Sequence, residues 1–197
     1  MKFQINTPTI GQESAIEYNN VVVRTLERET GYVPSLDKWR FIIEERVNGE
    51  LIWHFDISPI AGCGNECAAE KIITLRDHPE IRSTGELRDK NLSDEENLKA
   101  LKPFVHWNGG IRVHLTDFIQ KKSKKNEIVY LQSEAVEYLV AFSGSRQDTD
   151  AIIATHAVLE LNRYYREKHP EVYTDVDFGS LKDNTVIGAV LNRFGVK

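Results

Sequence analysis

The stretch "KWRFIIEERVNGELIWHFD", residues 38–56, decides the fold of this chain. Apolar side chains alternate with their neighbours on both sides of Asn48-Gly49, in the rows Trp39, Phe41, Ile43 and Leu51, Trp53, Phe55. A period of two is typical of strands, and Asn-Gly suits a type I′ turn because both central residues need a positive φ. The stretch therefore predicts a β-hairpin whose aromatic side chains belong to the core.

Helices are predicted on both sides of this hairpin. Apolar residues at helical spacing predict helices over residues 12–28 and 65–77. Ser93 with Glu96 predicts the capping box of a short helix that stops at Pro103. The other expected elements are strands beginning at Gly110, near 128–131 and at 136–142, a long helix from about Ser145 to Lys168 and a final helix over 184–194.

The order of these elements predicts an α+β fold. Hairpin-linked strands interrupted by helices favour an antiparallel sheet over a doubly wound parallel one. A nucleotide-binding loop is excluded, because "GCGNEC" at 62–67 lacks the third glycine and follows no parallel βαβ unit. We expect one α+β domain over residues 1–170 and a C-terminal arm with a terminal helix over residues 171–197.

Charge and composition disfavour several classes of partner. The 197 residues carry a formal charge of -5 and 41% apolar residues, which suits one globular domain and disfavours a protein that grips phosphate backbones. The lysine cluster at 121–125 has no interleaved aromatic residue and is interpreted as a solvated loop. We therefore expect no nucleic acid as partner.

The sequence shows no membrane-spanning segment and no export signal. No apolar run approaches a membrane span, and the start "MKFQINTPTI" lacks the apolar core of a secretory signal. Cys63 and Cys67 are too few and too close for a disulfide framework. These features predict a cytoplasmic protein without a membrane partner.

Two glycines, Gly109 and Gly110, stand where the strand after Trp107 begins. Glycine has no Cβ, so these residues allow unusual backbone angles and a close approach to their amides. A tight bend at the start of the strand is one reason for such a pair, and a ligand is another. Both alternatives stay open from the sequence.

Several short motifs resemble the GlcG/HbpS/PduO-C-terminal group, which includes haem-binding members and many of unknown function. Its Gly-Gly-Ile-Pro-like motif matches residues 109–111, with Arg112 where proline is usual, and its Lys-x-x-Thr motif matches Lys71 and Thr74. Its Ser-Gly motif with a following Asp and Ile-Ala pair matches Ser143, Gly144, Asp150, Ile153 and Ala154. The resemblance implies a profilin-like layered fold and a homo-oligomer.

The chain also departs from this family pattern. The strand before Ser143 reads "EYLVAFSG", with Tyr138 and Ala141 where glycines are usual, and these side chains would fill space that a ligand could use. The lysine-rich insertion and the tail after Pro170 have no counterpart in the family. Haem remains one possible cofactor, and the sequence names no other.

A binding hollow is expected between the Gly109-Gly110 turn and the Ser143-Gly144 turn. Main-chain amides at the start of a helix suit an anionic group such as a carboxylate or haem propionate. His114 adds an imidazole that could ligate iron, on a face shared with Arg112 that we expect to be solvated. The candidate cofactor-binding residues are Gly109, Gly110, Ile111, His114, Ser143 and Gly144.

Other candidate sites have simpler structural readings. Cys63 and Cys67, with His54 and His78, match no zinc-ligand spacing, and no metal site is predicted. Either cysteine could be a nucleophile near a helix start, but no base can be named. His106 is interpreted as a surface or core residue, and Asp148 and Asp150 as complements of a helix N-terminus. No catalytic residue is assigned.

Two functions follow as hypotheses. The first is a small-ligand-binding protein, with haem or another tetrapyrrole as ligand, that acts as a homo-oligomer. The alternative is a non-enzymatic assembly module without a cofactor, in which the C-terminal arm and long helix make subunit contacts. Whether the chain is an enzyme stays open, because the group it resembles contains members that process their ligands.

Overall fold

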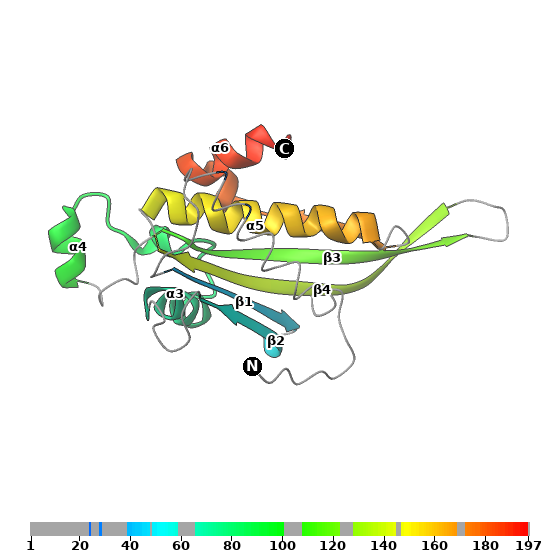
Figure 1. Ribbon diagram of the computed structural model, residues 1–197, viewed down its shortest axis with the longest axis horizontal. Coiled ribbons are helices and arrows are strands. Elements are labelled where there is room, and N and C mark those ends of the chain that lie inside the picture. The colour runs from blue at the N-terminus through cyan, green and yellow to red at the C-terminus, as the bar shows by residue number, and fades with distance from the viewer. Residues whose placement is uncertain are drawn as a thin grey trace.

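The computed structural model describes residues 39–47, 49–58, 66–100, 108–122, 128–144, 147–168 and 172–196, together with Arg24 and Arg28. Five strands form one antiparallel sheet in the order β2-β1-β4-β3-β5. Helices cover both faces of this sheet (Figure 1). The predicted α+β class with an antiparallel sheet is therefore confirmed, whereas the profilin-like detail stays a prediction.

The predicted hairpin consists of β1 (Arg40–Val47) and β2 (Glu50–Ile57). Its turn residue Gly49 has a φ of 81°, as a type I′ turn requires, and Asn48 lies outside the described residues. Trp39, Phe41 and Phe55 are buried as predicted. The side chain of Trp53 lies outside those described, and Leu51 is exposed rather than in the core.

A single strand, β4 (Ile128–Ser143), replaces the two short strands predicted near 128–131 and 136–142. The polar residues 132–134 between them suggested a break, but β4 pairs with β3 (Gly110–Lys122) on both sides of this stretch. Hydrogen bonds to a neighbouring strand can outweigh the local preference of a few polar residues. Lys121 and Lys122 thus belong to β3, and Lys124 and Lys125 lie outside the described residues.

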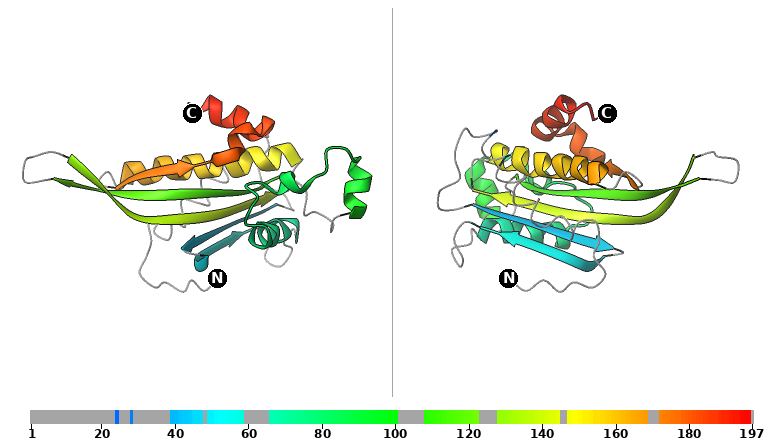
Figure 2. Two further views of the ribbon diagram at one scale, coloured as in Figure 1. Left: turned by 180° about the vertical axis from the view of Figure 1, so that it is seen from behind. Right: turned by 45° about the vertical axis from the view of Figure 1, so that its right-hand side comes forward.

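The sheet has an apolar layer on each face. One layer lies under α3 (Glu66–Asp77) and includes Ile42, Ile72, Leu75, Leu139 and Ala141. The larger one lies under α5 (Gln147–Lys168) and α6 (Thr185–Arg193), on the opposite face (Figure 2). Side chains alternate between these layers over residues 41–45 of β1 and 138–143 of β4, so both faces of the sheet are buried there.

The chain after Pro170 joins the sheet and the core. Residues 172–177 form β5, an edge strand paired with β3 that the sequence analysis missed. Phe178, Leu181, Ile187 and Leu191 are buried in the layer under α5. Asn184 caps the predicted final helix by accepting hydrogen bonds from Val186 and Ile187. The expected arm therefore packs on its own chain.

Two other predicted helices are present. The capping box of α4 (Asp94–Ala100) is confirmed by hydrogen bonds from Ser93 N to Glu96 Oε2 at 2.8 Å and from Glu96 N to Ser93 Oγ at 3.3 Å. The helix expected over 65–77 is α3. Of the helix expected over 12–28, only Arg24 and Arg28 are described, and both are helical. Ser145, where the long helix was expected to begin, lies outside the described residues. No helix in the described ranges is long and apolar enough to cross a membrane.

Candidate functional site

The structure brings the two predicted glycine turns together at one end of the sheet. Phe142 N donates a hydrogen bond to Gly109 O at 2.8 Å, and Gly110 lies opposite Ala141 in the ladder between β3 and β4. Ser143 and Gly144 follow directly on β4. We call residues 109–110 and 142–144 the glycine corner. The start of α5 and the middle of α3 meet here from opposite faces of the sheet.

Gly109 is required at this corner by its surroundings. Its φ is 109°, which L side chains rarely adopt, and a Cβ would lie 2.6 Å from Asp150 Cβ and 2.8 Å from Lys71 Nζ. The sequence left open whether a bend or a ligand explains the glycine pair. In the structure the backbone angle itself requires a glycine, and the groups that approach it closely belong to the chain itself.

Lys71 and Asp150 form a buried ion pair across the glycine corner. Lys71 Nζ donates to Asp150 Oδ2 at 3.0 Å and to Phe142 O at 2.8 Å, and its side chain is 0% exposed. Burial lowers the pKa of Lys71, although the nearby Asp150 opposes this shift. Because Lys71 belongs to α3 and Asp150 to α5, the pair connects the two helical layers around the end of the sheet.

Asp150 therefore has a role beyond the one predicted for it. The sequence analysis assigned Asp148 and Asp150 to the positive end of a helix. Asp148 fits that reading, since it is exposed and accepts a long hydrogen bond, 3.4 Å, from Asn108 Nδ2. Asp150 is buried and paired with Lys71. The Lys-x-x-Thr and Ser-Gly motifs held both members of the pair, but spacing alone could not show their contact.

Thr84 is a corner residue that the sequence analysis did not identify. Its Oγ1 accepts a hydrogen bond from Gly110 N at 3.3 Å, and its Cγ2 would lie 2.7 Å from a Cβ on Gly110. Thr84 begins a short 3₁₀ helix, Thr84–Leu87, with Ser83 as its N-cap. One of the amides expected to face a ligand is thus bonded within the chain.

Ile111 and His114 do not lie at the glycine corner. Ile111 is buried in the layer under α5. His114 lies on the opposite face, four residues along β3 from Gly110, which corresponds to about 13 Å of strand. Burial lowers the pKa of His114, and the charge of Arg82 lowers it further. Of the six predicted binding residues, four lie at the corner: Gly109, Gly110, Ser143 and Gly144.

The face that His114 shares with Arg112 is covered at Arg112, so the expectation of a solvated face is wrong there. The Arg112 side chain is buried under the end of α3, where its guanidinium donates to Leu75 O and to Ile81 O and pairs with Glu137. A strand pattern shows which residues share a face, but it does not show where a helix packs on that face.

The thiol of Cys67 lies beside the corner, in the first turn of α3. Burial raises the pKa of Cys67, and the charge of Lys71 and a hydrogen bond with Ser143 oppose that shift only in part. The protonated thiol is therefore favoured at neutral pH, and it is a weak nucleophile. Cys63 and His106 lie outside the described residues, and no group of ligands for a metal ion occurs among the residues that are described.

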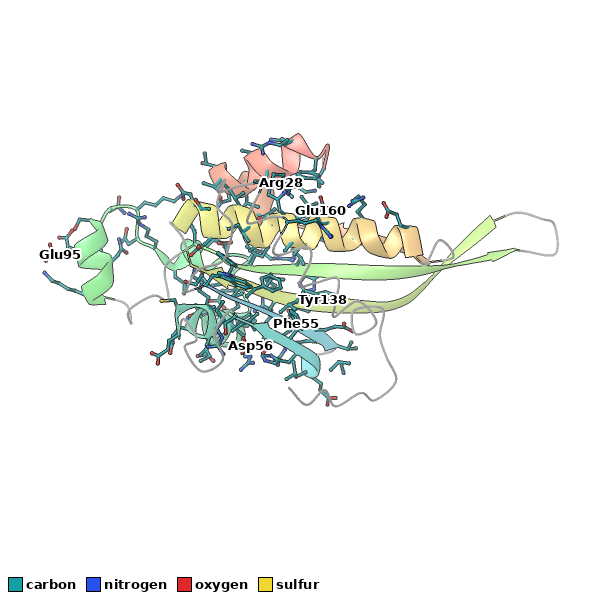
Figure 3. All side chains as sticks on the ribbon, in the orientation of Figure 1. Arg28, Phe55, Asp56, Glu95, Tyr138 and Glu160 are labelled. Carbon is teal, nitrogen blue, oxygen red and sulfur yellow. The ribbon has the colours of Figure 1, made fainter. Side chains whose placement is uncertain are left out.

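Of the two side chains expected to fill the hollow, Tyr138 lies away from the corner, whereas Ala141 lies directly opposite Gly110. Tyr138 is in the layer under α5, four residues along β4 from Phe142, and its hydroxyl donates to Glu45 Oε2 at 2.9 Å. Figure 3 shows Tyr138 near the middle of the sheet, away from its corner. Ala141 is buried under α3. The corner itself is filled by Lys71, Thr84 and Asp150.

A second polar cluster links α3 to the hairpin. Glu44 of β1 is fully buried and pairs with Arg76 of α3, Arg46 and His54. Burial alone would raise the pKa of Glu44, but hydrogen bonds and charges from His54 and Arg76 lower it to about 2. Glu44 is therefore a carboxylate at neutral pH and holds the C-terminal end of α3 on the sheet.

Comparisons with known proteins give this chain no relative. It matches no family model, no curated protein and no solved structure. The resemblance to the GlcG/HbpS/PduO-C-terminal group thus stays a prediction from short motifs.

Proposed function

We propose that this chain is a small-ligand-binding protein of the GlcG/HbpS-like type, located in the cytoplasm and acting as a homo-oligomer. The proposed ligand is anionic, with haem or another carboxylate-bearing tetrapyrrole as the class to test first. One observation supports this choice above the others. The glycine corner brings together two glycine turns, the N-terminal end of α5 and the Lys71 ammonium.

The electrostatics of the corner suit an anion. Lys71 is a buried cation whose attraction for negative charge is weakly screened. The N-terminal end of α5 adds a partial positive charge. Gly144 is exposed and has no side chain, so it leaves the outer side of the corner open to a ligand. A ligand carboxylate there would be attracted by the charge of Lys71, which Asp150 neutralises in part.

Haem titration tests the proposal directly. We expect a shift of the Soret band on adding haem to the purified protein, and native mass spectrometry should report the bound ligand together with the subunit count. No spectral change at high haem excess, with no other anionic ligand retained in the native mass spectrum, would sink the proposal.

A charge change at Asp148, beside the glycine corner, tests where the ligand binds and leaves the Lys71–Asp150 pair unaltered. Asp148→Lys replaces an exposed carboxylate at the start of α5, so it should tighten the binding of an anionic ligand by about threefold to tenfold. Glu167→Lys makes the same charge change near the other end of α5 and should leave binding unchanged. Equal effects of both variants would place the ligand away from the corner.

The alternative function is a non-enzymatic assembly module. It is favoured by the outer edge of β2, which pairs with no strand in the described part of the chain and carries exposed Leu51 and Ile52. Such edges can pair with another chain. Light scattering of Leu51→Lys and of the unchanged protein distinguishes the two functions. Loss of assembly in Leu51→Lys, with unchanged ligand binding, would support the assembly module.

A further inference from the structure

The paired strands β3 and β4 extend beyond the rest of the sheet. The pairing of β5 with β3 ends at Ile119 opposite Val172, so residues 120–122 and 128–130 pair only with each other in the described part of the chain. We call residues 120–122 and 128–130 the arm. From the glycine corner, β4 runs for about 50 Å and α5 for only about 33 Å. Figures 1 and 2 show the arm projecting past the end of α5.

The arm combines positive charge with apolar residues. Its register places Lys122 opposite Ile128 and Lys121 opposite Val129, so each face of this ribbon receives a lysine and an apolar residue. A two-stranded ribbon is at best marginally stable alone, and strands of this composition tend to associate with other chains. The whole chain carries a net charge of -5, so subtracting the two lysines of the arm leaves -7 on the other residues. The arm is therefore a basic and apolar projection on an acidic molecule.

The solvent-facing side of α3 has the complementary character. Glu66, Glu70, Ile73 and Asp77 follow one another at spacings of three and four residues and form one stripe along the helix, opposite its buried residues. Ile73 is 41% exposed. The three carboxylates form no ion pair with other described residues, and Arg76 beside Asp77 is paired with Glu44. We call these four residues the acidic stripe.

Nothing within one chain explains the acidic stripe. Glu66 and Glu70 are like charges four residues apart, which repel each other and weaken a helix slightly. An exposed isoleucine between carboxylates adds no stability from burial either. A basic and apolar surface that covered the stripe would relieve the repulsion and bury Ile73 at once. The arm is such a surface.

The arm and the acidic stripe lie toward opposite ends of the sheet. Lys71 of α3 contacts the glycine corner at the end of β4, whereas the arm contains the beginning of β4. The arm cannot reach the stripe of its own chain, because about 40 Å of strand separates it from the corner. Two copies that lie side by side in opposite directions bring each arm to the other's α3. A two-fold axis relates such copies, so the assembly is closed.

We propose that the arm of one copy docks on the acidic stripe of a second copy, and the reverse, in a two-fold dimer. The lysines of the arm meet Glu70 and Asp77, and its apolar residues cover Ile73. This inference rests on the homo-oligomer of the proposed function and names the surfaces that form it. Ligand binding at the glycine corner is a separate property and is measured separately.

Charge reversal on each surface tests the contact. The arm variant carries Lys121→Glu and Lys122→Glu, and the helix variant carries Glu70→Lys and Asp77→Lys. Each variant alone should raise the dissociation constant of the dimer by at least about tenfold, because like charges then face each other. An equimolar mixture of the two variants should form dimers again, because both contacts in the mixed dimer join opposite charges. Light scattering over a concentration series measures the mass.

The control is Glu95→Lys with Asp183→Lys, which changes the net charge as the helix variant does. Both carboxylates are exposed and belong to neither surface, so assembly should be unchanged. Assembly of the arm variant or the helix variant at the level of the unchanged protein overturns the proposal, as does a mixture that stays monomeric. If circular dichroism shows the helix variant to be unfolded, Ile73→Lys replaces it and should weaken the dimer by about tenfold. Unchanged assembly of Ile73→Lys would also refute the contact.

Failure of this contact is distinguishable from failure of the proposed function. If the unchanged protein binds ligand and assembles, but the variants assemble equally well, only the arm contact is wrong. A protein that is monomeric at every concentration overturns both the homo-oligomer and the arm contact. The haem titration then still decides whether the glycine corner binds a ligand.

Discussion

At the scale of single residues, Gly109 shows how a residue without a side chain can be required for the fold. Its backbone angle and three close neighbours leave no room for a Cβ, and those neighbours include both members of the Lys71–Asp150 pair. A substitution there acts on conformation and on packing at once.

We predict that Gly109→Ala lowers the free energy of unfolding by about 2–5 kcal/mol, from backbone strain and overpacking together. Gly195→Ala is the matched control, since Gly195 also has a positive φ, 71°, but nothing lies within 4 Å of its Cβ position. That control should cost about 1–2 kcal/mol. Urea unfolding measures both variants, and equal losses would show that the crowding at Gly109 is unimportant.

The pair behind Gly109 gives a second prediction at this scale. Lys71→Met leaves Asp150 buried without its cation and should destabilise the protein by about 3–5 kcal/mol. The double variant Lys71→Met with Asp150→Asn should be more stable than Lys71→Met alone, because the uncompensated charge is gone. A double-mutant cycle by urea unfolding checks this, and purely additive losses would contradict it.

At the scale of elements, local patterns in the sequence predicted most helices and the hairpin. The turn at Gly49 and the cap at Ser93 depend on adjacent residues, so the sequence alone was sufficient. The continuity of β4 was not predictable in this way, because it depends on pairing with β3 on both sides of residues 133 and 134. The edge strand β5 is six residues long, too short for a clear pattern beside its acidic residues.

The candidate site was predictable only in part, for a related reason. Short motifs identified the glycines, Lys71 and Asp150, but no local signal tells that a lysine on one face of a sheet reaches an aspartate on the other. Thr84 carries no motif, and its contact with Gly110 depends on tertiary packing. Strand alternation assigned His114 to a face of β3, but it gave no distance between His114 and the corner.

The link between α3 and β1 through Glu44 predicts a dependence on pH. The pKa of Glu44 is lowered from 4.5 to about 2 in the folded protein, so its contribution is complete above about pH 4.5 and is lost as the pH falls from there toward 2. We expect Glu44→Gln to lose about 1–2 kcal/mol at pH 7, less than the full shift implies because Arg76 and His54 are partly solvated.

The measurement is urea unfolding of Glu44→Gln and the unchanged protein at several pH values. Their difference in free energy should shrink as the pH falls through that window. Glu50→Gln on β2 is the control, since Glu50 is an exposed carboxylate, and it should leave the pH profile unchanged. A constant difference down to pH 2 would show that the Glu44 charge does not stabilise the fold.

At the scale of the whole molecule, the segment after Pro170 is part of the fold as well as a possible subunit contact. Removing residues 171–197 takes away β5 and the buried side chains Phe178, Leu181, Ile187 and Leu191. Each contributes about 1.5–3 kcal/mol by burial, which together rivals the stability of a typical domain.

We therefore predict that the truncated chain lacks a cooperative thermal transition by circular dichroism, whatever its effect on assembly. Leu181→Ala provides a graded test of the same idea and should cost about 2–5 kcal/mol. A truncated protein that still unfolds sharply would mean that the remaining strands and α5 form a sufficient core without β5 and α6.

The position of β4 has a consequence for how the chain is made. β1 is an inner strand of the finished sheet, yet the residues that complete it are about a hundred positions later, as Ile42 opposite Ala141 shows. During synthesis the hairpin therefore leaves the ribosome with one side of β1 unsatisfied, and it stays so until β4 emerges. Nascent chains stalled before residue 128 should be good clients for chaperones that shield unpaired strands.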